Sequence, residues 1–263
     1  MRADLGLPAV GGRSTGLRRE EVSYLSGVSV TWYTWLEQGR EINPSRQVLD
    51  AVARTLRLSV PERAYILTLA GYSTPQPAAA PIPQTVPGHV QRLLDALGIL
   101  PAYVLAPDWT ILAWTPAFAA TYPNVATVPE GDRNLLWLVF TDPYLRELQA
   151  NWEFHSSRHL AEFRAEAGPR LSEPSFTRLV ERLLEASAHF RASWENHDIE
   201  GFTSRERVYR HPVVGDIHLE LHRVAFSDHP GLHLVIYTPL QNTDTPARLR
   251  QLMTTKPRPK PRP

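Results

Sequence analysis

The chain has 263 residues, carries 28 Lys and Arg against 27 Asp and Glu, and contains no cysteine. A chain without thiols has neither a disulfide framework nor a thiolate metal site, and no apolar, basic leader indicates export. No apolar run reaches the roughly 18 residues that span a bilayer, so we expect a cytoplasmic protein that is not integral to a membrane.

The nearly balanced total charge hides a regional asymmetry. Residues 1–70 hold 9 basic and 7 acidic side chains, residues 71–244 hold 13 and 20, and residues 245–263 hold 6 and none. An acidic middle is a poor surface for a polyanion. Any contact with nucleic acid is therefore expected at the two ends of the chain.

A break in composition divides the chain. Residues 74–87, TPQPAAAPIPQTVP, contain five prolines and no charge, which is typical of a semi-rigid linker. We therefore expect a helical domain over residues 1–73 and a second domain over residues 88–252. The proline-rich basic tail, residues 253–263, is expected to be disordered.

The first domain begins with a helix-turn-helix pattern. Helices are predicted over Arg18–Ser26, with Val22 and Leu25 on its buried face, and over Ser29–Gln38, with Tyr33 and Leu36 buried. Gly27 between the two helices can adopt the left-handed conformation of a tight turn.

Two further helices are expected in this domain. Asn43 and Pro44 are predicted to cap and open the third helix. Ser59 and Glu62 form the pattern of a capping box at the start of the fourth.

The exposed face of the second helix and the arginines at two helix starts predict contact with duplex DNA. Cations at a helix start oppose the macrodipole unless a phosphate lies between them, and small side chains with a methyl group suit the thymine methyl in the major groove. The alternatives are that the charges are merely solvated and that Trp35 covers the edge of the domain core. The candidate DNA-binding residues are Arg18, Arg19, Val30, Thr31, Thr34, Trp35, Gln38, Arg40, Asn43, Ser45 and Arg46.

The segment Gly16–Gly71 resembles the helix-turn-helix of bacterial xenobiotic-response-element (XRE) regulators, in the branch with an MmyB-like sensor domain. The resemblance implies an arginine-rich first helix before the GLP segment, whereas this chain starts at MRADLGLP. Without that helix, the hydrophobic face around Tyr65–Leu69 is expected to lack one covering wall. Trp35 stands where relatives usually carry arginine, so the base preference stays open.

The sequence pattern of the second domain predicts an α+β fold. A helix is expected around His89–Leu97, then a hairpin of residues 102–105 and 110–114 around Pro107–Asp108, and a helical stretch over residues 134–196. Three strands are predicted at residues 204–210, 216–225 and 231–238. In the second of these, apolar side chains at Ile217, Leu219 and Leu221 alternate with polar ones, as in an antiparallel sheet with one wet face. This order suits a PAS-like fold.

The second domain also resembles the MmyB-like ligand-binding domain, through PAYVLAPDWTILAW, RNLLWLVFTDPYLRELQANW, WENHDI and HPVVGDIHLEL. The resemblance implies a PAS-like fold, homodimers and an apolar, fatty-acid-like effector. Thr115 stands where the family usually has asparagine.

Aromatic side chains in the helical stretch are candidates for the lining of an apolar pocket, although such residues fill cores more often. Two histidines are candidate hydrogen-bond donors to a ligand head group, with a purely structural role as the alternative. The candidate ligand-binding residues are Trp114, Phe118, Trp137, Phe140, Trp152, Phe190, Trp194, His197 and His211.

The leading hypothesis is a homodimeric, ligand-gated transcription regulator that binds double-stranded DNA and a small apolar ligand. A second is a regulator-derived lipid- or partner-binding module whose DNA binding is weakened or lost. A third is a haem or metal sensor that uses His155 and His159, four residues apart on one helix. Motifs for catalysis are absent, so neither an enzyme nor a cofactor is predicted.

Overall fold

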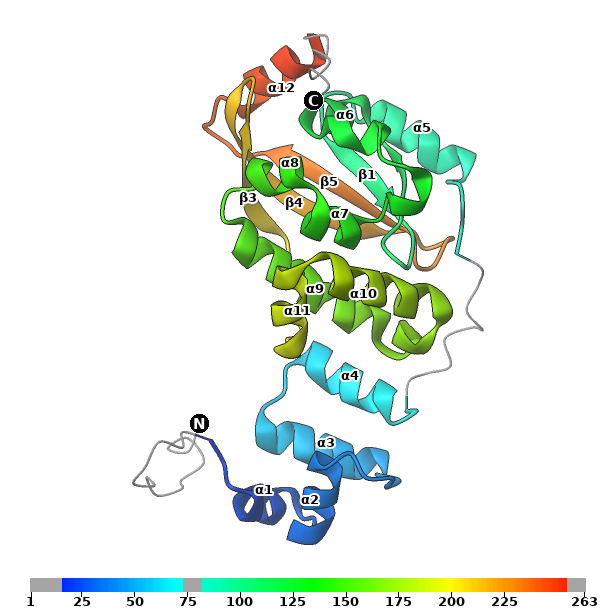
Figure 1. Ribbon diagram of the computed structural model, residues 1–263, viewed down its shortest axis with the longest axis vertical. Coiled ribbons are helices and arrows are strands. Elements are labelled where there is room, and N and C mark those ends of the chain that lie inside the picture. Colours follow the sequence, from blue (N-terminus) through cyan, green and yellow to red (C-terminus); the bar gives the residue numbers. More distant parts are fainter. Residues whose placement is uncertain (1–15, 73–81, 255–263) are drawn as a thin grey trace. The chain divides into compact units, whose positions relative to one another are not determined.

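The computed structural model describes residues 16–72 and 82–254, which fall into two compact units (Figure 1). The division between the units comes at Ala78. Most of the expected linker and nearly all of the expected basic tail lie outside the described residues. Within the described ranges, none of the helices is both long and apolar enough to cross a membrane.

The amino-terminal unit is helical. Its helices are α1 (Arg19–Ser26), α2 (Val30–Glu37), α3 (Arg46–Leu56) and α4 (Val60–Leu69). Gly27 adopts a φ of 72° and ends α1, as the turn between the two helices requires. The predicted capping box at Ser59 and Glu62 is present at the start of α4.

Two details of this unit differ from the sequence prediction. The third helix begins at Arg46 and not at Pro44, because the Ser45 hydroxyl accepts a hydrogen bond from the Val48 amide at 3.4 Å and so caps the helix. Leu25 is 37 % exposed and does not share the small core, which is formed by Val22, Tyr33 and Val52.

The carboxy-terminal unit is built on a five-stranded antiparallel sheet with the order β2-β1-β5-β4-β3. The strands are β1 (Ala102–Leu105), β2 (Ile111–Trp114), β3 (Arg205–His211), β4 (Gly215–Ala225) and β5 (His233–Pro239). The predicted α+β, PAS-like fold class is confirmed.

Helices cover one face of the sheet almost completely (Figure 1). Alternate strand residues, among them Tyr103, Leu219 and Tyr237, point into this larger core. The helices of this unit are α5 (Gly88–Ala96), α6 (Pro116–Thr121), α7 (Leu135–Thr141), α8 (Pro143–Leu148), α9 (Trp152–Ala167), α10 (Pro174–Ala186), α11 (Ala188–Glu195) and α12 (Thr245–Thr254). Short 3₁₀ turns lie at η2 (Pro123–Ala126), η3 (Glu130–Asp132) and η4 (Gly168–Ser172).

The opposite face of the sheet is covered only in part. Helix α5 buries Val90 and Leu94 against Val104 and Leu234 in a second, smaller core. On β4 the side chains of His218, Glu220 and His222 stay partly exposed on this face, which is the wet face that the alternation predicts.

Helix α12 closes the unit and was not predicted as a helix. Its first residue, Thr245, is buried, and the Thr245 hydroxyl accepts a hydrogen bond from the His218 amide at 2.9 Å. Leu249 and Leu252, three residues apart on α12, complete the larger core.

Candidate DNA-binding surface and ligand pocket

Helix α2 presents most of its candidate contact residues to solvent. The Ser29 hydroxyl accepts a hydrogen bond from the Trp32 amide at 3.2 Å and fixes the start of the helix, while Tyr33 is buried on the inner side. Val30 and Trp35 are each 39 % exposed. Thr31 and Gln38 are exposed as well, whereas Thr34 is half-buried.

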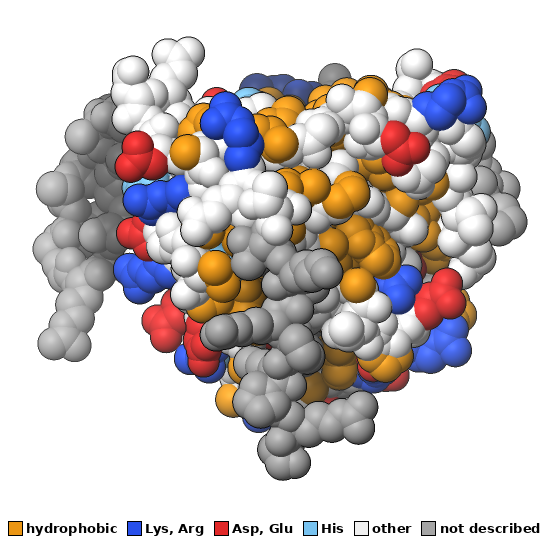
Figure 2. Space-filling view, turned by 90° about the horizontal axis from the view of Figure 1, so that it is seen from above, with side chains coloured by type: hydrophobic (Ala, Val, Ile, Leu, Met, Phe, Trp, Pro, Cys, Tyr) orange, Lys and Arg blue, Asp and Glu red, His pale blue; other side chains and the backbone are white. Residues whose placement is uncertain are grey.

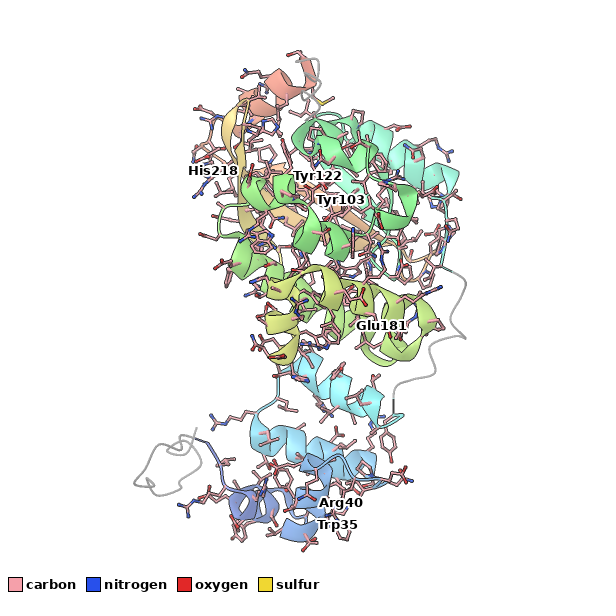
Figure 3. The ribbon with its side chains drawn as sticks, viewed as in Figure 1. Trp35, Arg40, Tyr103, Tyr122, Glu181 and His218 are labelled. Atoms are coloured by element: carbon pink, nitrogen blue, oxygen red, sulfur yellow. The ribbon has the colours of Figure 1, made fainter. Side chains whose placement is uncertain are left out.

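Trp35 lies beside Arg40 at one end of the unit (Figure 3). The Arg40 guanidinium carbon is 5.9 Å from the centroid of the Trp35 ring, within cation–π range. Trp35 is therefore not enclosed by the core of its own unit, and it places an aromatic face next to a cation on the outer side of α2.

Arg19 is held by an ion pair that the sequence analysis did not foresee. Its Nε donates to a carboxylate oxygen of Glu37, at the other end of the helix pair. The pair links α1 to α2 across the tight turn. Because of this ion pair, the charge of Arg19 is partly neutralised where it was expected to meet a phosphate. Glu37 also interacts with Tyr33, and burial together with a hydrogen bond to Glu37 raises the pKa of Tyr33 to about 12.

The other candidate phosphate contacts lie at helix starts. The Arg18 amide donates to Glu21 Oε2 at 2.8 Å, which satisfies the backbone at the start of α1 while the Arg18 side chain is exposed. Asn43, Ser45 and Arg46 are exposed at the start of α3. An exposed cation beside the positive end of a helix dipole suits an anion such as phosphate.

The described residues of α4 retain uncovered apolar surface. Leu69 is 64 % exposed and Val60 is 84 % exposed, while Tyr65 and Ile66 are half-buried. This is the region that was expected to lack a covering wall.

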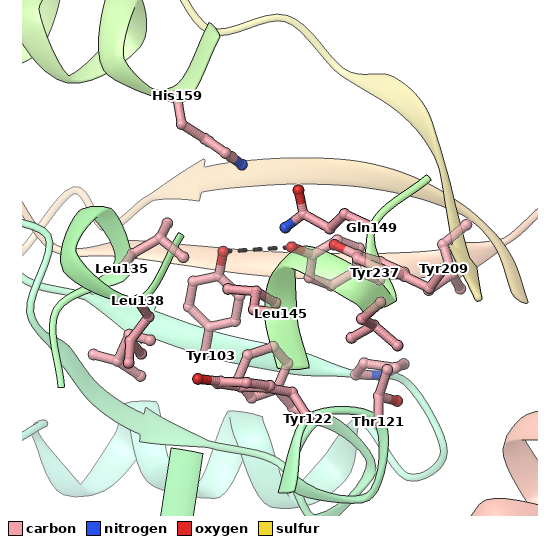
Figure 4. A pocket seen from close by; sticks show the side chains of 15 residues that line it. Tyr103, Thr121, Tyr122, Leu135, Leu138, Leu145, Gln149, His159, Tyr209 and Tyr237 are labelled. Carbon is pink, nitrogen blue, oxygen red and sulfur yellow. Dashed lines mark hydrogen bonds between the residues drawn. The ribbon is translucent and has the colours of Figure 1, made fainter. Parts of the chain in front are cut away.

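In the carboxy-terminal unit a small cavity lies between the sheet and the helices that cover it (Figure 4). Its free volume is about 20 Å³, which is enough for about one water molecule. The lining residues are mainly apolar: Pro101, Tyr103, Ile111, Phe118, Thr121, Tyr122, Leu135, Leu138, Leu145, Leu148, Gln149, His159, Tyr209, Leu219 and Tyr237.

Four polar side chains converge at one end of this cavity. The hydroxyls of Tyr103 and Tyr237 lie 3.4 Å apart, and Gln149 and His159 approach the same region from the helical side (Figure 4). Gln149 Oε1 is buried and has no hydrogen-bond partner among the described residues. A buried polar atom without a partner costs free energy, so its presence marks a place where a ligand or water can bind.

Buried positive charge lies close to this polar end. Arg207, only 3 % exposed, places one guanidinium nitrogen against Nδ1 of His155, while its Nη2 has no hydrogen-bond partner among the described residues. Burial raises the pKa values of Tyr103 and Tyr237, and the charge of Arg207 opposes this rise. The tyrosine hydroxyls therefore stay protonated and can donate to an anionic group.

One of the nine candidate ligand residues, Phe118, lines this cavity. Its ring centroid lies 4.7 Å from that of Tyr103. The other eight candidates do not line the cavity: Trp114, Trp137, Phe140, Trp152, Phe190, Trp194, His197 and His211.

The remaining aromatic candidates pack against other parts of the unit. Phe140 lies edge-on to Phe190 at 5.0 Å, and Phe190 stacks on Trp194 at 5.6 Å. The Trp152 indole donates to the Val139 carbonyl at 2.8 Å. Trp114 and Trp137 are half-buried, each with an arginine over its ring: Arg133 at 4.9 Å and Arg182 at 4.2 Å.

The histidine candidates are dispersed. His197 is exposed, and His211 Nε2 lies 3.4 Å from the Tyr144 hydroxyl. His155 faces Arg207, while His159 reaches the cavity and has its pKa lowered to about 4, chiefly by burial. In the described part of the chain, His155 and His159 do not belong to any group of three metal-binding side chains.

The sequence analysis missed the polar residues that line the cavity. Tyr209 and Tyr237 lie inside predicted strands, at positions that share the inward face with apolar neighbours. The alternation of side chains along these strands could therefore have identified them as inward-facing. Gln149 and Tyr103 carried no comparable signal, because only the folded sheet brings them together.

Comparison with protein-family models gave two matches. Residues 12–66 match a helix-turn-helix domain, and residues 86–252, more than half of the chain, match the MmyB-like transcription regulator ligand binding domain. Neither of these families is one of enzymes. A comparison with curated proteins gave no match. The chain belongs to the family of MmyB-like transcription regulators, in which a DNA-binding helix-turn-helix is combined with a ligand-binding domain.

Proposed function

We propose that this ligand-regulated, DNA-binding transcription regulator acts in the cytoplasm as a homodimer. Its DNA-binding surface is formed by the exposed side of α2 with the arginines of α1 and α3. Its effector is a small, apolar, fatty-acid-like molecule. The main support for the DNA-binding part of this proposal is the solvent exposure of Thr31, Trp35 and Gln38 along one helix.

The DNA contacts divide into two classes. Arg40 and Arg46 are exposed cations that suit phosphates, whereas Val30, Thr31 and Trp35 offer methyl groups and an aromatic face to base edges. Phosphate contacts supply affinity that depends on salt, and base contacts supply preference for sequence. The two classes therefore respond differently to substitution.

Fluorescence anisotropy with the promoter next to the chain's own gene, and with a scrambled fragment, tests this surface. Arg46→Ala is expected to weaken binding to both fragments and to lower the salt slope by about 0.9 for each phosphate that is no longer neutralised. Thr31→Ala is expected to weaken binding to the promoter selectively, by about 1 kcal/mol.

Arg54→Ala is the matched control, because Arg54 is exposed at the opposite end of the same helix α3. Equal affinities and salt slopes for the wild type, Arg46→Ala and Arg54→Ala would reject the phosphate contact. A footprint is expected to protect two half-sites about one helical turn apart, as a dimer requires.

Self-association has support in the apolar surface of the carboxy-terminal unit. Val213, just before β4, and Val224, at the far end of β4, are each more than half exposed and belong to separate parts of the surface. Figure 2 shows further hydrophobic side chains on the face that is seen from above, between scattered basic and acidic ones. Apolar side chains rimmed by polar ones are typical of protein interfaces.

The ligand proposal rests on the chemistry of the cavity. A mainly apolar wall suits a hydrocarbon tail, and the hydroxyls of Tyr103 and Tyr237, close to the buried charge of Arg207, suit a carboxylate. Sites for small molecules typically have roughly 300–1,000 Å³, so a cavity of about 20 Å³ must widen to admit such an effector. The ligand then stabilises an open state, and its differential affinity for the two states controls binding to DNA.

Titration with dodecanoate and its methyl ester tests this proposal. Tyr237→Phe is expected to weaken dodecanoate binding about three- to tenfold because one hydrogen bond to the carboxylate is removed, and to affect the ester less. Trp194→Phe changes a predicted ligand residue that does not line the cavity. A larger effect from Trp194→Phe than from Tyr237→Phe would move the site to the aromatic cluster of α11.

A further inference from the structure

A cluster of two histidines and one aspartate lies on the surface of the carboxy-terminal unit, away from the cavity lining. His89 belongs to the first turn of α5, while Asp228 and His229 belong to the turn between β4 and β5. One potential ligand atom from each of these residues lies within 4.8 Å of the other two. Among the described residues, this is the one group of three or more His, Asp or Glu side chains with such spacing.

The two imidazoles converge on one carboxylate oxygen. His89 Nε2 lies 3.2 Å from Asp228 Oδ2, and His229 Nε2 lies 3.7 Å from the same oxygen. The edge of a tetrahedron with metal–ligand bonds of about 2.1 Å is about 3.4 Å. The two observed spacings lie on either side of this value, and the potential ligand atoms of His89 and His229 lie within 4.8 Å of each other.

The elements that carry these ligands are fixed by buried neighbours. Val90, next to His89, is fully buried, and Leu232 is 2 % exposed; both belong to the small core under the sheet. The turn is closed by a hydrogen bond from the Leu232 amide to the His229 carbonyl at 3.1 Å. Metal ligands on rigid, preorganised elements lose little entropy on binding.

The side chains themselves are accessible. The exposed fractions are 45 % for His89, 59 % for Asp228 and 40 % for His229. The two imidazole rings stack at 5.4 Å with an interplanar angle of 22°, so both present the same edge to the carboxylate. The positive end of the α5 dipole disfavours a cation here, and the charge of Asp228 offsets that effect.

We propose that His89, Asp228 and His229 bind one divalent first-row transition metal ion of the Zn²⁺ class, with water in the remaining positions. Two imidazoles and one carboxylate favour such an ion over Mg²⁺ or Ca²⁺, which prefer oxygen ligands alone. The ion links the first helix of this unit to the β4–β5 turn. This site shares no residue with the cavity lining or with the candidate DNA-binding residues.

Calorimetric titration of the full chain with Zn²⁺, in parallel with Co²⁺ absorption spectra, tests the proposal. The wild type is expected to bind one equivalent at this site, with the visible Co²⁺ bands of a site that contains nitrogen ligands. His89→Ala and His229→Ala are each expected to lower the Zn²⁺ affinity at least tenfold. Asp228→Asn is expected to lower it as well, with little change to the fold.

His197→Ala is the matched control, because His197 is an exposed histidine outside the cluster. Saturating Zn²⁺ is expected to raise the Tm of the wild type and of His197→Ala, but not of His89→Ala. No binding by the wild type, or equal affinities for the wild type, His89→Ala and His229→Ala, would overturn the assignment. Neither result depends on DNA binding or on the fatty-acid-like effector.

Discussion

At the scale of single residues, partners decide what each charged side chain is able to do. Arg19 and Arg46 both stand at helix starts, yet Arg19 is paired with Glu37 and Arg46 remains exposed to solvent. An exposed ion pair contributes little to stability. It does, however, lower the positive charge that the surface offers to a phosphate.

Glu37→Gln is expected to strengthen DNA binding severalfold and to steepen its salt dependence, because it releases Arg19 and removes a negative charge from α2. Glu41→Gln is the control, since it removes an exposed charge in the same region and leaves the ion pair intact. Anisotropy measured over a series of salt concentrations gives both slopes. Identical gains in the two variants would show that Arg19 takes no part.

His159 illustrates how burial changes titration. Its pKa is lowered to about 4, first by burial and then by nearby arginines. Between the ordinary value of about 6.5 and pH 4, the unfolded chain takes up a proton at this residue and the folded chain does not. The contribution of His159 to stability is therefore lost as the pH falls through this range.

The free energy of unfolding, measured in urea from pH 7 to pH 4, checks this effect. The difference between the wild type and His159→Gln is expected to change by about 2–3 kcal/mol over this range. Burial also raises the pKa of neighbouring Glu162 to about 7, which acts with the opposite sign but is present in both proteins. His197→Gln, at an exposed position, is expected to follow the wild type; a parallel curve for His159→Gln would contradict the prediction.

At the scale of elements, caps and turns set where helices and strands begin. Ser45 shortens α3 relative to the sequence prediction, because its hydroxyl accepts a hydrogen bond from the Val48 amide in the first turn and so displaces Asn43 as the cap. Gly231 sets the conformation of the β4–β5 turn. It adopts a φ of 92°, and a Cβ atom at this position would lie 2.8 Å from Cγ of Pro107.

Gly231→Ala is therefore expected to destabilise the carboxy-terminal unit by more than about 2 kcal/mol, through backbone strain and a clash with a rigid proline ring. Gly98→Ala is the comparison: Gly98 has a φ of 60° but open space around the added carbon. It is expected to cost about 1 kcal/mol. Equal midpoints for the two variants in urea would show that the turn moves away from Pro107.

At the scale of the whole molecule, the distribution of charge along the chain indicates which segments can contact DNA. Residues 71–244 carry 20 acidic and 13 basic side chains, while residues 245–263 carry 6 basic side chains and no acidic ones. Deletion of residues 255–263 is expected to flatten the salt dependence of DNA binding by about one to four units, since each phosphate that a cation neutralises releases condensed counterions. An unchanged slope would exclude a role for this segment in DNA binding.

The helix-turn-helix, the α+β class and the alternation of β4 followed from the sequence, because each rests on local periodicity, capping or turn residues. Ser59, Gly27 and the Ile217–Leu221 alternation needed no knowledge of distant contacts. The same holds for the exposed residues of α2, whose helical spacing alone separates them from Tyr33.

Tertiary structure alone decided which residues meet. The cavity collects Tyr103 from β1, Gln149 after α8 and Tyr237 from β5, while four of the predicted aromatic residues pack together on α7, α9 and α11. The pairing of Arg19 with Glu37 and the meeting of His89 with Asp228 are likewise long-range. Local periodicity fixes the face on which a side chain lies, but it does not fix the partner across from it, because that depends on how the elements pack.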